Sequence, residues 1–211
     1  MKTYDLMSPV SLMLAFGVVA AGCGAFETKK KGQKARENDS SLNGTWQNSC
    51  TKMDWLGFTY YRVTYKFSAL GDFDKTTSLF ADASCAEAIG SLSESGTYAA
   101  LGDAADTAQA KDINFTISEA KISADTDQAV KLLNAAAYCG ISDWQKGRAT
   151  DVLDKPCVGF QHVKGKVIFD IYKVDQNDKR LETGKGSIFL DKGDVSSRPK
   201  SLDEANTFFK K

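Results

Sequence analysis

The chain has 211 residues, of which 42% are hydrophobic and 26% are charged, and these values are typical of a globular protein. Lysine plus arginine and aspartate plus glutamate number 27 each, so the formal net charge is zero. Because nucleic-acid-binding proteins usually carry a basic excess, the composition argues against a nucleic-acid partner.

An apolar segment at residues 7–22 ends in small residues directly before Cys23. Its strongest part has the length of a signal-peptide core, whereas a membrane-spanning helix takes about 20 apolar residues. The run Val-Ala-Ala-Gly-Cys at 19–23 resembles the lipobox of bacterial lipoproteins. The resemblance implies cleavage before Cys23 and a diacylglycerol anchor with palmitate-type chains on its sulfur. The alternative is a buried helix with an incidental cysteine.

These features predict a signal peptide at 1–22, a lipidated tether at 23–41 and one folded domain at 42–211. Gly24, and not an aspartate, follows the cysteine. In the lipoproteins that the segment resembles, this implies sorting through the periplasm to the outer membrane. Residues 27–41 are polar and cannot bury enough apolar surface to fold, so we expect a flexible spacer. Its lysines serve either solubility or contact with anionic headgroups.

Short alternating segments then predict strands. In residues 61–67 tyrosine, valine and phenylalanine alternate with polar side chains, which is typical of a half-buried strand. Residues 113–117 and 167–171 repeat this pattern, and 187–190 indicate a late strand. Weaker candidates lie around Trp46, Leu79, Tyr98 and 158–160. We therefore predict a mainly β fold, an antiparallel meander of about eight strands closed into a barrel.

Two helices are predicted beside these strands. Residues 125–138 contain good helix formers between the fifth and sixth strands, with Asp125, Thr126 or Asp127 as the N-cap. Residues 201–209 predict a short C-terminal helix, because Ser201 and Glu204 have the spacing of a capping box.

Four cysteines remain in the domain: Cys50, Cys85, Cys139 and Cys157. An even number in an exported chain predicts two disulfides, since that compartment is oxidising. Three pairings are possible, and we favour Cys50 with Cys85 and Cys139 with Cys157. The alternative, a metal or redox site, has no Cys-x-x-Cys motif to support it.

Motifs that would indicate catalysis are scarce. His162 is the single histidine, and we expect it at a strand end, facing solvent. The glycines at 184 and 186 lack the spacing of a phosphate-binding loop and favour a hairpin turn. The acidic loop residues lack the EF-hand pattern and favour solvated turns. We predict no enzyme activity, no metal and no cofactor.

Gly44-Thr-Trp46 stands where the first strand begins, and Arg198 stands near the end of the domain. This pair resembles the Gly-x-Trp signature and the late arginine of lipocalins, and the whole chain is similar to lipocalin-like lipoproteins of Gram-negative bacteria. The resemblance implies that Arg198 stacks on Trp46, a contact of about 0.5–2 kcal/mol. The inserted helix departs from the family, whose helix follows the last strand.

Trp55, Phe58 and Tyr61 cluster after the first strand, and they either line a ligand site or pack the core. The first functional hypothesis is a membrane-anchored envelope lipoprotein whose barrel binds a small apolar ligand. The second is a filled barrel that acts as a structural or protein-interaction module. The third, an enzyme that uses His162 or loop carboxylates, is the least supported. The sequence identifies no protein partner.

Overall fold

The computed structural model describes residues 39–55, 57–159, 161–186 and 194–211. The predicted signal peptide, the predicted lipidation site Cys23 and most of the predicted tether lie outside this range, as does the late strand predicted at 187–190. Among the described residues, no helix is long and apolar enough to cross a membrane.

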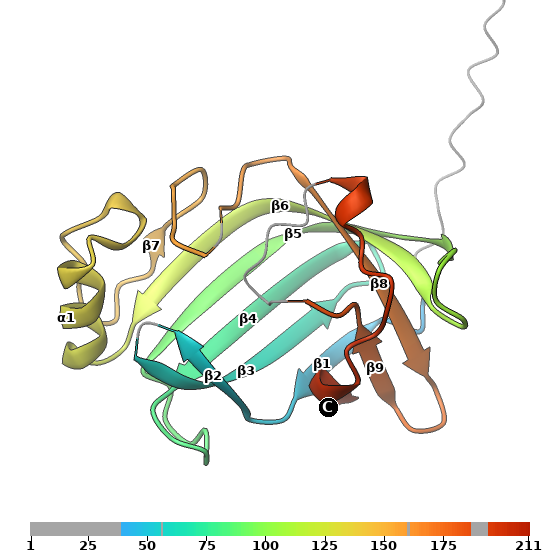
Figure 1. Cartoon of the computed structure of the whole chain (residues 1–211), viewed down its shortest axis with the longest axis horizontal. Coiled ribbons are helices and arrows are strands. Elements are labelled where there is room, and N and C mark those ends of the chain that lie inside the picture. Colours follow the sequence, from blue (N-terminus) through green and yellow to red (C-terminus); the bar gives the residue numbers. More distant parts are fainter. Residues whose placement is uncertain (1–38, 56, 160, 187–193) are drawn as a thin grey trace, which may run out of the picture. The chain divides into compact units, whose positions relative to one another are not determined.

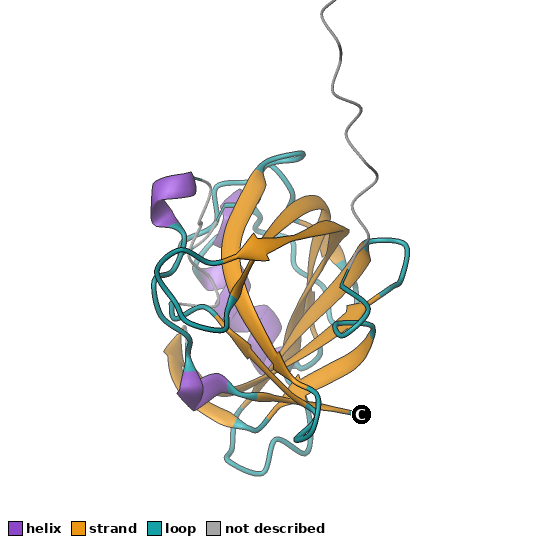
Figure 2. Ribbon diagram, turned by 90° about the vertical axis from the view of Figure 1, so that its right-hand side faces the viewer, coloured by secondary structure: helices purple, strands orange, loops and turns teal. Residues whose placement is uncertain are grey.

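Eight strands of the described chain form a closed antiparallel barrel (Figures 1 and 2). Each ring strand pairs with the next one along the chain, and the last returns to pair with the first, which is the predicted meander. The ring strands are β1 (Gly44–Asn48), β3 (Phe58–Phe67), β4 (Asp72–Phe80), β5 (Gly90–Asp103), β6 (Lys111–Ala124), β8 (Val167–Asp175), β9 (Arg180–Thr183) and β10 (Phe208–Lys210). Two short strands flank the ring: β2 (Thr51–Trp55) pairs with β3, and β7 (Thr150–Asp151) pairs with β6.

The alternation read from residues 61–67 is confirmed in β3. Tyr61, Val63 and Phe67 are buried in the barrel core, and the side chains between them are more exposed. The pattern in 113–117 is confirmed in β6, where Ile113, Phe115 and Ile117 are buried. These period-two faces close the barrel around one continuous hydrophobic core.

Strand β8 turns its other face to the lumen. Ile168 and Asp170 line the interior and Tyr172 belongs to the core, whereas the alternating series from Val167 to Ile171 occupies the opposite face. There the guanidinium of Arg198 lies 5.2 Å from the centre of the Phe169 ring. The segment that carries Arg198 therefore covers the outer face of β8. Because both faces of this strand are covered, both carry apolar side chains, and periodicity alone does not show which face points into the lumen. The weak strand candidate at 158–160 is wrong for Val158, which lies in a turn.

The inserted helix is confirmed as α1 (Asp127–Ala135), with Thr126 as its N-cap, followed by a 3-10 turn at Tyr138–Gly140. It stands between the fifth and sixth ring strands and lies at one end of the barrel (Figure 1). Ala129 and Leu133 are buried and face Phe58 and Leu92 across a narrow gap. The helix therefore closes that end of the lumen.

The predicted C-terminal helix is wrong. Residues 201–209 contain a 3-10 turn at Glu204–Asn206 and then enter β10. A second 3-10 turn lies at Val195–Ser197. Pairing of Phe208 with Leu181 and of Lys210 with Trp46 completes the ring, so tertiary pairing overrides the local capping signal.

Candidate functional site

Three ionisable side chains meet inside the barrel. Lys75 on β4 and Glu94 on β5 are direct cross-strand neighbours, and the Lys75 Nζ lies 2.8 Å from a Glu94 carboxylate oxygen. The other Glu94 oxygen lies 2.7 Å from the Nε2 of His162. Glu94 and His162 are buried, and the Lys75 side chain is only 11% exposed. We call Lys75, Glu94 and His162 the lumen cluster.

His162 reaches the lumen from the loop that follows β7. The amide of Asp154 donates to the His162 carbonyl, and the Asp154 carboxylate accepts from the amide of Lys164. The amide of Gly165 donates to the carbonyl of Ile117 on β6. These bonds fix the loop against the barrel wall. The predicted solvent-facing position of His162 is therefore wrong, because a long-range contact with Glu94 draws it inside.

The lumen cluster is charged. Burial acts to raise the pKa of Glu94, but the Lys75 charge and the His162 hydrogen bond outweigh it and lower that pKa to about 2. Burial acts to lower the pKa of Lys75, but the negative charge of Glu94 reverses this and holds it above its ordinary value. Burial also raises the pKa of the nearby Tyr65 to about 12. At neutral pH the site thus holds a carboxylate, an ammonium and a neutral phenol.

A cavity of about 70 Å³ adjoins the lumen cluster. One part of its wall is aromatic and aliphatic, and it includes Tyr65, Phe73, Phe115, Ile117 and Phe208. The remaining described wall is polar, and it includes the lumen cluster with Asn48, Asp170, Thr183, Asp203 and Asn206. This space holds several waters or a molecule of a few heavy atoms.

Asp170 and Asn206 are held by specific bonds. An Asp170 oxygen accepts from the amides of Ile171 and Gly184, at 2.8 Å and 3.1 Å. Asn206 accepts from the hydroxyl of Tyr61 at 2.7 Å. The carboxylate and the amide are therefore pre-positioned at the edge of the cavity.

The predicted aromatic ligand residues lie at separate places. Phe58 is buried below α1, at the closed end of the barrel. Tyr61 reaches the cavity edge only through its bond to Asn206. Trp55, in β2, pairs through its backbone with Phe58 at the start of β3. The Trp55 side chain lies outside the described part of the structure. Their role in binding stays a prediction, and the lumen cluster was missed.

A signal for the lumen cluster is present in the sequence. Lys75 is in phase with Phe73 and Leu79, so period two places it on the buried face of β4. Glu94 is likewise in phase with Leu92. Two opposite charges in phase with core residues of neighbouring strands indicate a buried pair. The contribution of His162 carries no comparable local signal.

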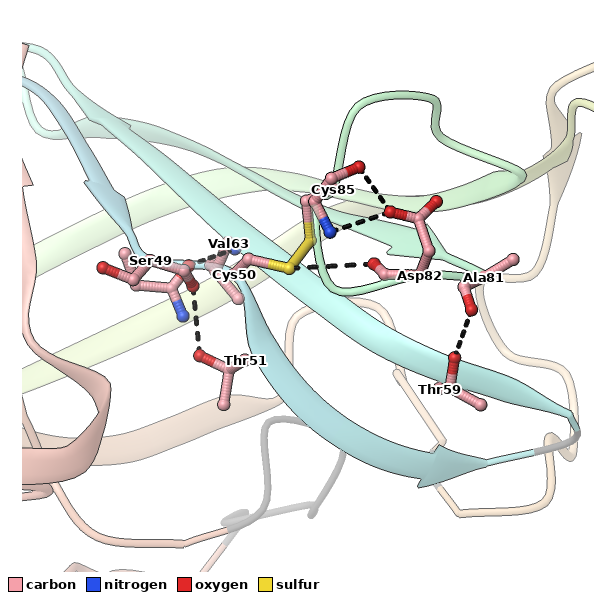
Figure 3. The surroundings of a disulfide bond; sticks show 10 residues. Ser49, Cys50, Thr51, Thr59, Val63, Ala81, Asp82 and Cys85 are labelled. Carbon is pink, nitrogen blue, oxygen red and sulfur yellow. Dashed lines mark hydrogen bonds between the residues drawn. A yellow bond between two sulfur atoms is a disulfide. The ribbon is translucent and has the colours of Figure 1, made fainter.

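The structure contains both favoured disulfides, Cys50–Cys85 and Cys139–Cys157. Figure 3 shows the first, which joins the link between β1 and β2 to the loop between β4 and β5. Beside it the Asp82 carboxylate accepts from the Ser84 amide, and the Asp82 carbonyl accepts from the Cys85 amide. The second bridge ties the turn after α1 to the loop that carries His162.

The predicted stack of Arg198 on Trp46 is not the contact that either residue makes. Arg198 lies over Phe169 and donates to the carbonyls of Ile113 and Asp170. The Trp46 ring is covered by Lys210, whose Nζ lies 5.2 Å from the ring centre. Gly44 has a φ of +119°, which disfavours any side chain. Both signature elements are thus structural, with different partners from those that the resemblance implied.

The sequence matches no protein-family model and no curated protein. The residues that the structure describes include no group of three or more histidine, cysteine, aspartate or glutamate side chains arranged to hold a metal ion.

Proposed function

We propose that this chain is a lipid-anchored envelope lipoprotein whose lipocalin-like barrel binds a small molecule in its lumen. The observation that carries the proposal is the cavity beside Lys75, Glu94 and His162 inside a closed meander barrel. Buried ionisable groups are costly, and they gather where a protein binds or transforms a ligand. An enclosed space with a few oriented polar groups is the usual form of a small-molecule site.

The anchor is supported by the lipobox-like run before Cys23. Two disulfides in a domain of this size fit an oxidising compartment such as the periplasm. Sorting to the outer membrane rests on Gly24 and on the lipoprotein resemblance.

The dimensions of the cavity favour a very small ligand. Pockets for drug-sized ligands occupy about 300–1,000 Å³, and this cavity occupies about 70 Å³. Its wall is polar on one side, so we propose a ligand of a few heavy atoms that makes polar contacts, instead of an acyl chain.

A filled barrel that acts through its surface is the second candidate. Rings of Tyr65, Phe67, Phe73, Tyr98 and Phe115 pack together in one half of the lumen. Helix α1 closes the other end. This packing favours a stable module whose loops contact partners in the envelope.

Native mass spectrometry of the protein purified in detergent from its own envelopes tests the binding function. A co-purified small molecule of constant mass supports it, and its loss in Glu94→Gln protein that keeps the wild-type circular dichroism spectrum locates it in the lumen. A clean apo mass under conditions that preserve weak complexes favours the filled barrel. Labelling of cells with a palmitate analogue tests the anchor separately. Label is expected on the wild type and absent from Cys23→Ser, and equal label on both contradicts the anchor.

A further inference from the structure

A row of three polar side chains lines the cavity where the end of β1 contacts the 3-10 turn at Glu204–Asn206. The Asn48 amide nitrogen lies 3.4 Å from the amide oxygen of Asn206, and the Asn206 nitrogen lies 2.9 Å from a carboxylate oxygen of Asp203. Asn48 is only 4% exposed, and Asp203 and Asn206 are half-buried. A ligand in this cavity therefore meets two carboxamides and one carboxylate.

Fixed partners orient both carboxamides of this row. The backbone N–H of Val63 can only donate, and it donates to the Asn48 oxygen at 2.6 Å, so the Asn48 NH2 group is turned towards Asn206. The Asp203 carboxylate accepts from Asn206, so the Asn206 NH2 group lies on the side of Asp203. The Tyr61 hydroxyl donates to the Asn206 oxygen at 2.7 Å. The row therefore presents two N–H donors and then a carboxylate acceptor in a fixed order.

This row has hydrogen-bonding capacity to spare. Each NH2 group carries two N–H donors, and a carboxylate has two oxygens that accept. Within the described residues, each of the two NH2 groups donates once, and the Asp203 carboxylate accepts through Oδ2. By contrast, the side chains of the lumen cluster pair with one another. The row therefore offers a ligand N–H donors beside a carboxylate acceptor.

Aromatic rings line the same cavity. Phe208 follows Asn206 by two residues, is 3% exposed and belongs to the cavity wall. Its ring meets that of Tyr65 edge to face, with the ring centres 5.3 Å apart, and Phe115 also lines the cavity. Contact with such rings removes a hydrocarbon group from water, which is favourable. The cavity thus suits a ligand with a short apolar part and one polar group that both accepts and donates.

We infer that the lumen binds a small neutral primary carboxamide, whose carbonyl oxygen accepts from Asn48 and Asn206 and whose NH2 group donates to Asp203. This inference rests on the binding function proposed above and names its ligand class. A primary carboxamide carries an acceptor and a donor on one carbon atom, which matches the neighbouring groups of the row. Its short alkyl part packs against Phe208 and Tyr65. The cavity volume of about 70 Å³ excludes longer chains.

Three probes of nearly the same shape test the ligand class: propionamide, butanone and sodium propionate. The full exported protein, purified in detergent, is titrated with each probe at constant ionic strength, and NMR follows the side-chain NH2 signals of Asn48 and Asn206. Propionamide is expected to shift both signals saturably. Butanone and propionate should bind at least about 10-fold more weakly, because butanone gives the Asp203 carboxylate no donor and propionate brings a second negative charge to it.

Asp203→Asn tests whether this carboxylate sets the preference, with Asp178→Asn in the exposed turn after β8 as the matched control. An asparagine side chain is neutral and can donate, so propionate should gain at least about 10-fold in affinity relative to propionamide in Asp203→Asn. In Asp178→Asn the ratio of the two affinities should stay that of the wild type. The ratio compares two probes on the same protein, so a partial loss of folded protein does not change it. An unchanged ratio in Asp203→Asn overturns the inference.

The remaining outcomes separate the ligand class from the binding function. Butanone or propionate that binds as tightly as propionamide overturns the carboxamide class and leaves the binding function intact. Absence of saturable binding for all three probes also overturns the carboxamide class. The binding function fails as well only when native mass spectra show no co-purified small molecule.

Discussion

At the scale of single residues, the Lys75–Glu94 ion pair shows how burial, at a fixed distance between the charges, changes the contribution of a pair to stability. Its oxygen–nitrogen distance of 2.8 Å equals that of the exposed Glu119–Lys121 pair, whose side chains are 59% and 46% exposed. We expect Glu94→Gln to lower the free energy of unfolding by about 3–5 kcal/mol, since it leaves a buried ammonium without its counter-charge. Glu119→Gln should cost less than about 1 kcal/mol. Urea unfolding followed by tryptophan fluorescence measures both, and equal costs would contradict the burial of the pair.

The same carboxylate makes stability depend on pH. The folded pKa of Glu94 is lowered to about 2, below its unfolded value of about 4.3. Because the unfolded state binds the proton more readily, the stabilisation is fully present above about pH 5 and is lost as the pH falls towards 2. We expect wild-type protein to lose more stability across this window than Lys75→Met/Glu94→Leu, which lacks the pair. Urea unfolding at pH 7, 5, 4 and 3 measures the difference, and parallel curves would refute it.

Predictions for single residues succeeded for the disulfide bonds. They failed where a side chain's environment depends on a noncovalent partner far away in the sequence. An even cysteine count in an exported chain predicts two disulfides, and of the three possible pairings the favoured one is confirmed. Trp46 is buried as expected of a signature residue, yet Lys210 covers it in place of Arg198. The sequence predicts that His162 faces solvent, because nothing nearby in the sequence reveals its partner Glu94, 68 positions earlier.

At the scale of secondary-structure elements, the end of the chain forms strand β10 in place of the predicted helix, and two neighbouring phenylalanines test this difference. In a strand Phe208 and Phe209 point to opposite faces, and they are 3% and 48% exposed. We expect Phe208→Ala to lower the free energy of unfolding by about 3–5 kcal/mol, because it empties a core position. Phe209→Ala should change it by about 0.5 kcal/mol or less. Thermal and urea unfolding compare the two variants, and similar losses would contradict the strand.

Elements with strong internal signals were predictable. The central strands alternate clearly, and α1 begins at one of the three caps proposed from sequence. The short strands β9 and β10 have little periodicity of their own. They form because β9 pairs with β8 and β10, and β10 pairs with β1. Gly96 is required by a neighbouring strand. At a bulge between β5 and β6, an added Cβ at this position would lie 2.0 Å from the carbonyl oxygen of Thr116.

At the scale of the whole molecule, the barrel has distinct ends. Asp39 is the first residue that the structure describes, and its carboxylate accepts from Lys111 at 2.7 Å and from the Tyr172 hydroxyl at 2.9 Å. Lys111 begins β6, whereas α1 follows the other end of that strand. The described chain therefore enters the barrel at the end away from α1 and from the Cys139–Cys157 bridge.

The two disulfides join different parts of the molecule, and we expect their removal to lower the free energy of unfolding by unequal amounts. Cys50–Cys85 spans 35 residues across β3 and β4, and Cys139–Cys157 spans 18 residues around the loop that carries His162. Loop-closure entropy predicts a loss of about 4 kcal/mol for the first bridge and about 3 kcal/mol for the second, when each is replaced by two alanines. Urea unfolding of the two double variants and of the wild type measures these losses.

The second bridge has an additional consequence that separates it from the first. Without it the loop is less restrained, so the contact between His162 and Glu94 should weaken while the strands stay paired. We expect the ring protons of His162 to show broadened or shifted NMR signals in Cys139→Ala/Cys157→Ala. In Cys50→Ala/Cys85→Ala the same signals should keep their wild-type positions, because that bridge lies between other elements. Unchanged His162 signals in both variants would mean that the hydrogen bonds of Asp154 and Gly165 hold the loop without the disulfide.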